Sequence, residues 1–227
     1  MNATAIKVYS MQWLSDFQEL RLVSAMKLYR IVGPLIVGIE FDSRPASDNY
    51  QVFVTMYGLW QEDIRYCLRY PIIFEGLVDQ RGLQIFLGDR DHSTRFEDAR
   101  RSLRESFGHL VEGSLELGDA LRYCDQYIAG NQLSSSPNSY RVAHVLQEEI
   151  SLCLAVSSIG RAEEIYRKVK DTDWDNNNFR AFKTSVSEWS DKIERQMGDP
   201  ETIRANVQLN RNNPKLKHLL VSELAMS

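Results

Sequence analysis

The chain has 227 residues, of which 43% are hydrophobic and 26% are charged, and its formal net charge is −4 at pH 7. This composition is typical of a folded protein of one or two domains, and it excludes a globally disordered chain. The mild negative charge argues against a surface built to coat nucleic acid or anionic lipid, so we do not expect a nucleic-acid partner.

The sequence predicts a protein of a reducing compartment. Its first twenty residues lack the basic start, the continuous apolar core and the small-residue cleavage site of a signal peptide. The longest nearly apolar run, residues 31–39, has nine residues and is too short to span a bilayer as a helix. Cys67, Cys124 and Cys153 are widely spaced among apolar neighbours, which is typical of reduced core residues. We therefore expect a cytoplasmic protein without a membrane anchor.

The first part of the chain predicts one helix and a hairpin. Apolar residues at helical spacing predict a helix over residues 10–29, with Ser10 as its N-cap. Residues 35–42 and 50–59 are rich in β-branched and aromatic side chains and predict two strands. The turn-forming residues 43–49 between them predict an antiparallel hairpin.

Two shorter apolar runs predict further strands, over residues 71–78 and 83–87. Four strands and one helix within 90 residues are typical of an antiparallel sheet with a helix packed on one face. The sequence therefore predicts an α+β unit over residues 1–90.

The rest of the chain reads as consecutive helices. Thr94 and Glu97 match a capping box, and the helix after it is expected to reach about residue 110. Apolar residues at intervals of three and four predict the next helices, over residues 117–128, 142–156 and 161–170. The sequence predicts a helical unit over residues 91–227, either separate from the first unit or continuous with it as one domain.

Helix-start signals recur near the C-terminus. Asp175 is suited to be an N-cap, and the apolar stripe after it predicts one helix as far as Met197. Asp199 and Pro200 are a typical N-cap and first helical residue. A leucine stripe after Pro214 predicts a last helix.

One group of residues suggests a metal site. Asp89, Asp91 and His92 follow the predicted fourth strand, and two carboxylates with an imidazole are suitable ligands for Mg²⁺ or Mn²⁺. Such a site would support a metal-dependent enzyme acting on a phosphorylated or nucleotide substrate. The alternative is that these residues form an ordinary turn, because acidic groups before a helix N-terminus complement its dipole.

The remaining catalytic signals are weak. No two of the four histidines stand three or four residues apart, and His144 lies in an apolar helix stripe, as expected of a core or boundary residue. The sequence contains no nucleophile elbow, phosphate loop or dinucleotide fingerprint. Four arginines between residues 95 and 104 alternate with acidic residues, which favours a solvated, salt-bridged helix face over a nucleic-acid patch.

The segment from Tyr57 to Phe74 is rich in aromatic and arginine residues, the types enriched at the energetic centres of protein interfaces. Its candidate interface residues are Trp60, Arg65, Tyr66, Arg69 and Tyr70. The alternative is that the aromatic residues belong to the core. We therefore predict a non-enzymatic, cofactor-free protein of the bacterial cytoplasm, of the inhibitor, immunity-protein or adaptor type, that covers the surface of a protein partner. The metal-dependent enzyme remains the second hypothesis.

Overall fold

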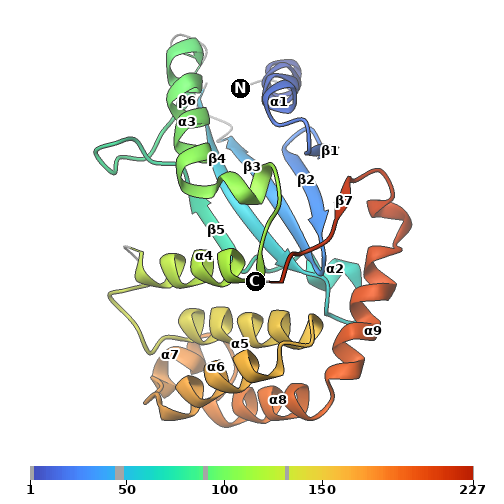
Figure 1. Ribbon diagram of the computed structural model, residues 1–227. Coiled ribbons are helices and arrows are strands. Elements are labelled where there is room, and N and C mark those ends of the chain that lie inside the picture. Colours follow the sequence, from blue (N-terminus) through green and yellow to red (C-terminus); the bar gives the residue numbers. More distant parts are fainter. Residues whose placement is uncertain (1–2, 44–48, 89–91, 131–132, 227) are drawn as a thin grey trace. The chain divides into compact units, whose positions relative to one another are not determined.

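The computed structural model describes residues 3–43, 49–88, 92–130 and 133–226 (Figure 1). These residues form a largely antiparallel sheet with packed helices and a mostly helical C-terminal part, which confirms the predicted α+β class. Within these ranges, no helix is long and apolar enough to cross a membrane.

The chain divides into two compact units. Unit 1 contains Met1–Tyr57, Ile73–Glu116 and Pro214–Ser227. Unit 2 contains Gly58–Ile72 and Leu117–Asn213. Each unit therefore combines residues from before and after position 90.

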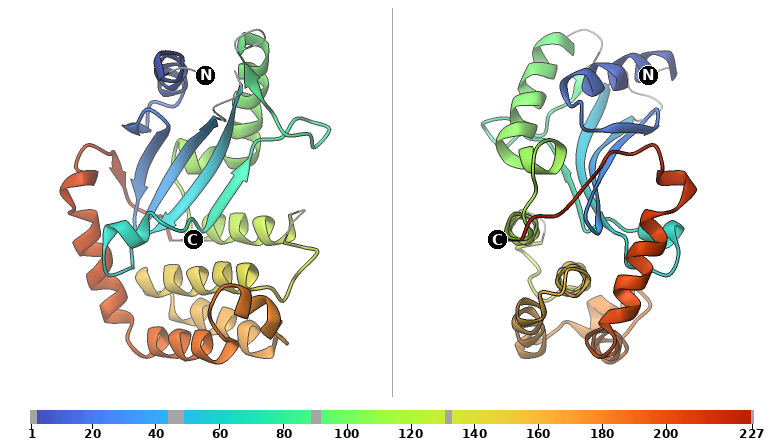
Figure 2. Two further views of the ribbon diagram at one scale, coloured as in Figure 1. Left: turned by 180° about the vertical axis from the view of Figure 1, so that it is seen from behind. Right: turned by 45° about the vertical axis from the view of Figure 1, so that its right-hand side comes forward.

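Unit 1 is built around the sheet. Its strands are β1 (Arg21–Ser24), β2 (Lys27–Val32), β3 (Leu35–Ser43), β4 (Asn49–Gly58), β5 (Ile73–Gly76), β6 (Leu87–Gly88) and β7 (Val221–Ser222). The strand order is β1-β2-β3-β4-β5, with β6 also paired to β4 and β7 paired in parallel to β2. The strands twist relative to one another, as both views in Figure 2 show.

Helices α1 (Ala3–Asp16) and α3 (His92–Val111) cover one face of this sheet. Trp13 of α1 is fully buried and contacts the rings of Phe41 in β3 and Phe96 in α3. The indole nitrogen of Trp13 also donates a hydrogen bond to the Tyr50 hydroxyl in β4, at 3.2 Å. Large aromatic side chains from two helices and two strands therefore form the core of unit 1.

Unit 1 also buries one arginine, Arg30 of β2, which is 1% exposed. Its guanidinium donates to the carbonyl oxygens of His109 at 2.6 Å and Gly113 at 2.8 Å, and more weakly to that of Leu110 at 3.3 Å. It also pairs with the Glu19 carboxylate. The buried charge therefore has both an opposite charge and hydrogen-bond acceptors.

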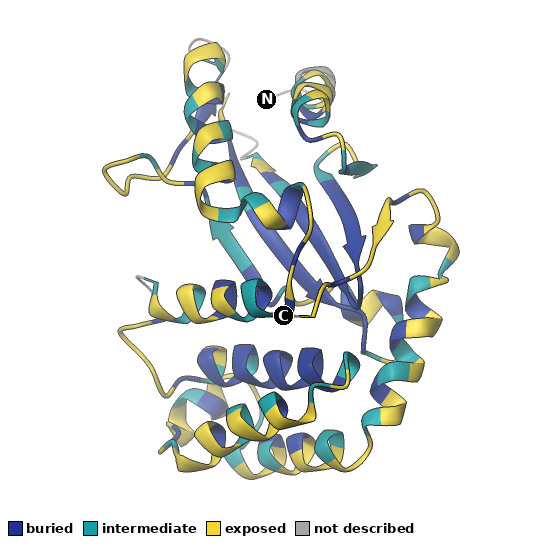
Figure 3. Ribbon diagram, in the orientation of Figure 1, coloured by how far each residue is buried: buried dark blue, intermediate teal, exposed yellow. Residues whose placement is uncertain are grey.

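Unit 2 is helical. Its helices are α2 (Ile64–Cys67), α4 (Leu117–Ala129), α5 (Tyr140–Ala155), α6 (Ile159–Asp171), α7 (Asn176–Ala181), α8 (Val186–Gly198) and α9 (Pro200–Arg211). Helix α5 lies at the centre and packs against α4, α6, α8 and α9. Because it has neighbours on several sides, α5 is buried around most of its circumference (Figure 3), whereas its neighbours bury one stripe each.

The predicted helix over residues 10–29 is wrong beyond Asp16. The chain turns after α1 and forms β1 and β2, because residues 27–32 pair with β3 over their whole length. Ser10 lies inside α1 and donates its hydroxyl hydrogen to main-chain carbonyls, so it is not an N-cap. Pairing with distant strands overrides the local helical spacing here.

The predicted strands over 35–42, 50–59 and 71–78 are confirmed with shifted bounds, and the one over 83–87 is confirmed only at its end. Residues 35–42 and 50–59 correspond to β3 and β4, which are neighbours in the sheet. The predicted strand over 71–78 is the shorter β5, and of 83–87 only Leu87 lies in a strand, while Gln84 forms an isolated bridge to Val78. Most of the predicted turn lies outside the described residues.

Two of the three predicted helix starts are confirmed by N-cap hydrogen bonds, and the third is wrong. Asp175 accepts hydrogen bonds from the backbone of α7, and Asp199 caps α9 with Pro200 as its first residue. Thr94, by contrast, lies inside α3, so it is not the N-cap that the sequence predicts.

Two predicted helices fail for reasons visible in the backbone. The helix after Asp175 is broken into α7 and α8 at Lys183, whose φ of 60° is left-handed, and Ser185 starts α8 with its own capping box. After Pro214 the chain forms only a short 3-10 turn and then β7. The predicted terminal helix is wrong because Val221 and Ser222 pair with β2 instead.

Candidate binding site in unit 2

A cavity of about 450 Å³ lies within unit 2. Its walls come from the segment 58–72, from the first half of α5, and from Phe182 and Lys192 at the end of α7 and in α8. A volume of this size falls within the range of ligand pockets, about 300–1,000 Å³. The wall contains both aromatic and titratable side chains, so this cavity is the strongest candidate site in the described parts of the chain.

The segment 58–72 is held in place by α9. The buried side-chain amide of Asn210 donates to the carbonyl oxygens of Leu59 at 2.8 Å and Gln61 at 2.7 Å. The amide of Asn206, one turn earlier, donates to the carbonyl oxygen of Trp60 at 3.1 Å. These bonds give partners to three consecutive main-chain carbonyls of a segment that has no sheet or helix of its own there.

Trp60 links this segment to α5. A Cβ atom at Gly58 would lie 2.1 Å from the Trp60 ring, so the absence of a side chain at Gly58 lets the indole pack there. The indole nitrogen of Trp60 donates to Oε2 of Glu148 at 2.8 Å. Trp60 is 3% exposed, and Glu148 is also buried. Trp60 therefore positions a buried carboxylate at the pocket wall.

The other oxygen of Glu148 faces His144, one turn away on α5. Nδ1 of His144 lies 3.8 Å from Oε1 of Glu148, and the His144 side chain is 24% exposed. Nε2 of the same ring is buried and has no hydrogen-bond partner among the described residues. Burial lowers the pKa of His144, Glu148 raises it, and Lys192 and Arg141 lower it further. The net direction is downward, so the imidazole is neutral at pH 7.

Aromatic side chains form much of the pocket rim. Tyr66 and Tyr70 line the pocket and are 55% and 60% exposed. Two further lining residues come from α5 and the end of α7: the Tyr140 ring stacks on Phe182 with centroids 4.7 Å apart, and Phe182 is itself 53% exposed. Single exposed aromatic residues are common on protein surfaces, but several gathered around one cavity mark a candidate binding site.

Cationic side chains complete the rim. Arg141 and Lys192 line the pocket, and Arg69 lies over the neighbouring Tyr70 ring at 5.2 Å. None of the three forms an ion pair within the described ranges, although Arg141 donates a hydrogen bond to the Tyr127 hydroxyl at 2.8 Å. The pocket rim is therefore locally positive in a chain whose net charge is −4.

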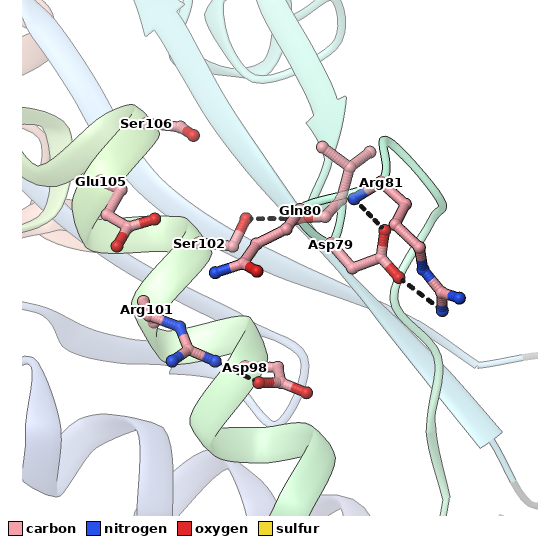
Figure 4. Close-up of a pocket in the computed structure, with 9 residues that line it drawn as sticks. Asp79, Gln80, Arg81, Asp98, Arg101, Ser102, Glu105 and Ser106 are labelled. Atoms are coloured by element: carbon pink, nitrogen blue, oxygen red, sulfur yellow. Dashed lines mark hydrogen bonds and ion pairs between the residues drawn. The ribbon is translucent and has the colours of Figure 1, made fainter.

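A second depression, of about 400 Å³, lies in unit 1 between residues 78–81 and α3 (Figure 4). Its charged side chains are mostly paired: Arg81 with Asp79 at 3.3 Å, and Arg101 with Asp98. Most of these side chains are exposed to water. A solvated surface whose charges are already matched gains little from a ligand, so the pocket in unit 2 is the better candidate.

The structure separates the predicted interface residues into two groups. Tyr66, Arg69 and Tyr70 are exposed and lie at or beside the pocket, and Arg65 is exposed and paired with Asp63 at 3.0 Å. Trp60 is buried, as the core alternative predicts, so it supports the pocket wall from inside.

The predicted metal ligands are only partly described. Asp89 and Asp91 lie outside the described residues. Nε2 of His92 lies 2.9 Å from the Tyr50 hydroxyl, and its ring stacks on Tyr9 with centroids 3.9 Å apart. Across the described residues, no three histidine, cysteine, aspartate or glutamate side chains group as a metal site would require.

The sequence offered no strong signal for several pocket residues. Arg141, Phe182 and Lys192 are far from Tyr66 in sequence, and only folding of unit 2 brings them together. One weak signal is available, because His144 and Glu148 stand one helical turn apart in a helix that is rich in apolar residues. Cys67 also lines the pocket, but burial raises the pKa of its thiol to about 11, so it is not a thiolate nucleophile.

The comparisons with known proteins add no relative. No family model matches the chain, and neither the curated proteins nor the solved structures contain a significant match. The function must therefore be inferred from the site itself.

Proposed function

We propose that this protein is a non-enzymatic binding protein that covers the surface of a protein partner. The binding surface comprises Arg65, Tyr66, Arg69 and Tyr70 together with the adjoining pocket of unit 2. The observation that carries the proposal is the exposure of Tyr66 and Tyr70, at 55% and 60%, on the rim of a cavity of about 450 Å³.

The chemistry of this surface supports binding of a protein. Tyrosine and arginine are over-represented among residues whose truncation weakens protein interfaces most, because they bury a large area and still form directional hydrogen bonds. Tyr66 and Tyr70 are anchored to a segment that Asn206 and Asn210 fix to α9. A rim held in this way loses less conformational entropy on binding than a free loop would.

The mechanism would be occlusion. A side chain of the partner enters the pocket, while Tyr66, Tyr70 and Arg69 pack against the surface around it. No group of this protein reacts; the partner's own site is blocked or its surface is held. The metal-dependent alternative gains no support, since two of its three ligands are outside the described residues and the third already contacts Tyr50 and Tyr9.

The test is a comparison of capture from the lysate of the native host, with identification by mass spectrometry. Three baits are used: the unmodified chain, Tyr66→Ala/Tyr70→Ala, and Phe86→Ala. Phe86 is a matched control because it is 46% exposed but lies in unit 1. We expect one stoichiometric protein that binds the unmodified chain and Phe86→Ala but binds the double variant at least about tenfold more weakly. Capture that is the same with all three baits would contradict the proposed surface.

A further inference from the structure

We propose that the pocket of unit 2 receives a carboxylate group carried next to an aromatic or aliphatic group, with Lys192 and Arg141 at the carboxylate and Tyr66, Tyr140 and Phe182 around the apolar part. This inference deepens the proposed function and rests on it, because it specifies the chemistry of the group that the partner inserts. Its grounds are the charge of the pocket, an unpartnered buried nitrogen and the aromatic wall.

The charge of the pocket favours an anion. Lys192 and Arg141 line it without an ion pair within the ranges that the structure describes. The carboxylate in the described wall, Glu148, is buried and already accepts the Trp60 indole N–H at 2.8 Å. Two cations facing a cavity are stabilised when a ligand supplies the negative charge that the protein does not.

The buried nitrogen of His144 gives the carboxylate a third partner. Nδ1 lies 3.8 Å from Oε1 of Glu148, which is too long for a hydrogen bond, and Nε2 is buried without a partner in the described chain, so a ligand reaches Nε2 only when this ring or a side chain over it moves. When a carboxylate enters, Nε2 takes up one proton from solvent. The imidazolium then lies between two carboxylates, with Nδ1–H toward Glu148 and Nε2–H donating to the ligand. No covalent bond to the ligand forms.

The aromatic wall selects what the carboxylate is attached to. Tyr140 and Phe182 form a stacked pair in the wall, and the segment 58–72 contributes Tyr66 and Tyr70 to the same pocket. Such surfaces bind apolar and aromatic groups well and bind small hydrophilic acids poorly. A free inorganic anion or acetate would therefore be a poor ligand, and a peptide with an aromatic residue beside a carboxylate would be a good one.

The coupling between ligand and proton fixes the pH dependence. The titratable and charged groups that line the pocket with His144 are Tyr140, Arg141 and Glu148 on α5, Lys192 on α8, and Tyr66, Cys67 and Tyr70 from the segment 58–72; the Tyr140 ring stacks on that of His144 with centroids 6.4 Å apart. Burial and the two cations hold the pKa of the imidazole down in the free protein, and a bound carboxylate raises it. The complex therefore binds one more proton than the free protein, and affinity rises as pH falls.

The experiment uses the full chain, labelled with ¹⁵N, and three capped peptides followed by NMR titration. The first is acetyl-glycyl-phenylalanine, which has a free terminal carboxylate. The second is its C-terminal amide, which has the same shape without the charge. The third, acetyl-glutamyl-phenylalanine amide, carries the carboxylate on a side chain. The protein variants are Lys192→Ala, Arg141→Ala and His144→Gln, with Lys217→Ala, an exposed lysine of unit 1, as the charge-matched control.

We expect the carboxylate peptides to shift resonances of the pocket residues and to bind at least tenfold more tightly than the amide. Lys192→Ala and Arg141→Ala should each reduce that preference several-fold, whereas Lys217→Ala should leave it unchanged. His144→Gln should remove the gain in affinity between pH 8 and pH 6 even if some binding remains. The first and third peptides then show whether a terminal or a side-chain carboxylate is preferred.

Three outcomes would overturn the inference: equal binding of the acid and the amide, an acid preference that survives Lys192→Ala and Arg141→Ala together, or no shift of pocket resonances at about 10 mM peptide, ten times a millimolar dissociation constant. Failure here is distinguishable from failure of the proposed function. If a captured protein depends on Tyr66 and Tyr70 while the peptides show no acid preference, only the carboxylate inference falls. If the carboxylate peptides bind but the captured protein binds Tyr66→Ala/Tyr70→Ala as well as the unmodified chain, the proposed function is contradicted.

Discussion

The two units of this protein bury ionisable side chains in different ways. In unit 1, the Arg30 guanidinium has the Glu19 carboxylate and carbonyl oxygens within reach. In unit 2, Nε2 of His144 and Oε1 of Glu149 are buried without a hydrogen-bond partner in the described chain. A fully partnered buried charge is a structural element, whereas a buried ionisable group without a hydrogen-bond partner is a candidate for titration or for binding.

Whether a buried ionisable side chain has hydrogen-bond partners distinguishes residues that stabilise the fold from residues that are candidates for binding. Arg30 joins β2 to the C-terminal end of α3 and to Gly113 just after it, and its guanidinium is hydrogen-bonded within the fold. His144 lies on a pocket wall, and Glu149 lies deeper, against α4 and α6. We therefore expect substitutions in unit 1 to change stability, and substitutions at the pocket of unit 2 to change binding. The expected effects on stability decrease from Arg30 to the rim of the pocket.

The largest effect is expected at Arg30. Arg30→Met removes the guanidinium and leaves buried carbonyl oxygens and Glu19 without their donor, which should destabilise the fold by about 3–5 kcal/mol. The measurement is chemical denaturation followed by circular dichroism. Arg65→Met removes only the exposed pair with Asp63, which water screens, so it should destabilise the fold far less than Arg30→Met does. Equal effects of the two substitutions would remove the distinction between the units.

Glu149 should make stability depend on pH. Burial raises its pKa to about 8, from an ordinary value of 4.5, so the folded state holds the proton more tightly than the unfolded state. Its contribution is fully present below pH 4.5 and is lost as pH rises through 8. Between pH 5 and pH 9 the free energy of unfolding of the unmodified chain should therefore fall by about 2–4 kcal/mol more than that of Glu149→Gln, at about 1.4 kcal/mol per pKa unit.

The measurement for Glu149 is the free energy of unfolding at both pH values. Glu164→Gln, on the exposed face of α6, is the control and should leave the pH profile unchanged. A Glu149→Gln profile parallel to that of the unmodified protein would show that the buried carboxyl finds a partner in solution.

Asn210 should matter through the segment that it holds. Asn210→Ala removes the donor to the Leu59 and Gln61 carbonyls and should cost about 2–3 kcal/mol, since each buried acceptor loses its partner. Asn212→Ala, an exposed neighbour, should cost less than about 0.5 kcal/mol. Thermal unfolding compares the two. If Asn210→Ala melts like Asn212→Ala, the segment is held by other contacts.

The smallest stability effect is expected at the rim of the pocket. Tyr66→Ala/Tyr70→Ala should change the free energy of unfolding by less than about 0.5 kcal/mol for each residue, because both side chains are mostly exposed. The same denaturation measurement checks this. A loss of several kcal/mol would mean that the two tyrosines belong to the core, and the binding test with this variant could no longer be interpreted.

Much of the fold follows from local signals in the sequence. Asp175, Asp199 and Pro200 start helices where their capping chemistry predicts. The failures occur where pairing across the sheet outweighs local spacing. Residues 27–29 and Val221 fall within runs whose apolar spacing predicts a helix, but main-chain pairing within the sheet gives them their conformation.

The site could be predicted only in part. The composition of the segment 58–72 identifies Tyr66, Arg69 and Tyr70, and it also includes Trp60, which the fold buries against Glu148. Periodicity cannot separate a core tryptophan from an interface one, because both need a large apolar surface. Lys192 and Phe182 enter the pocket only through the packing of unit 2, which no local pattern encodes.

The most direct test of the proposed binding site is hydrogen–deuterium exchange on the full chain, with and without the captured and purified partner. We predict that the partner slows exchange in the segment 64–72 and at the N-terminal half of α5, where the pocket lies. We predict no change around residues 78–81 and α3 of unit 1, where the other depression lies. Protection confined to unit 1 would contradict the claim that the pocket of unit 2 is the binding site.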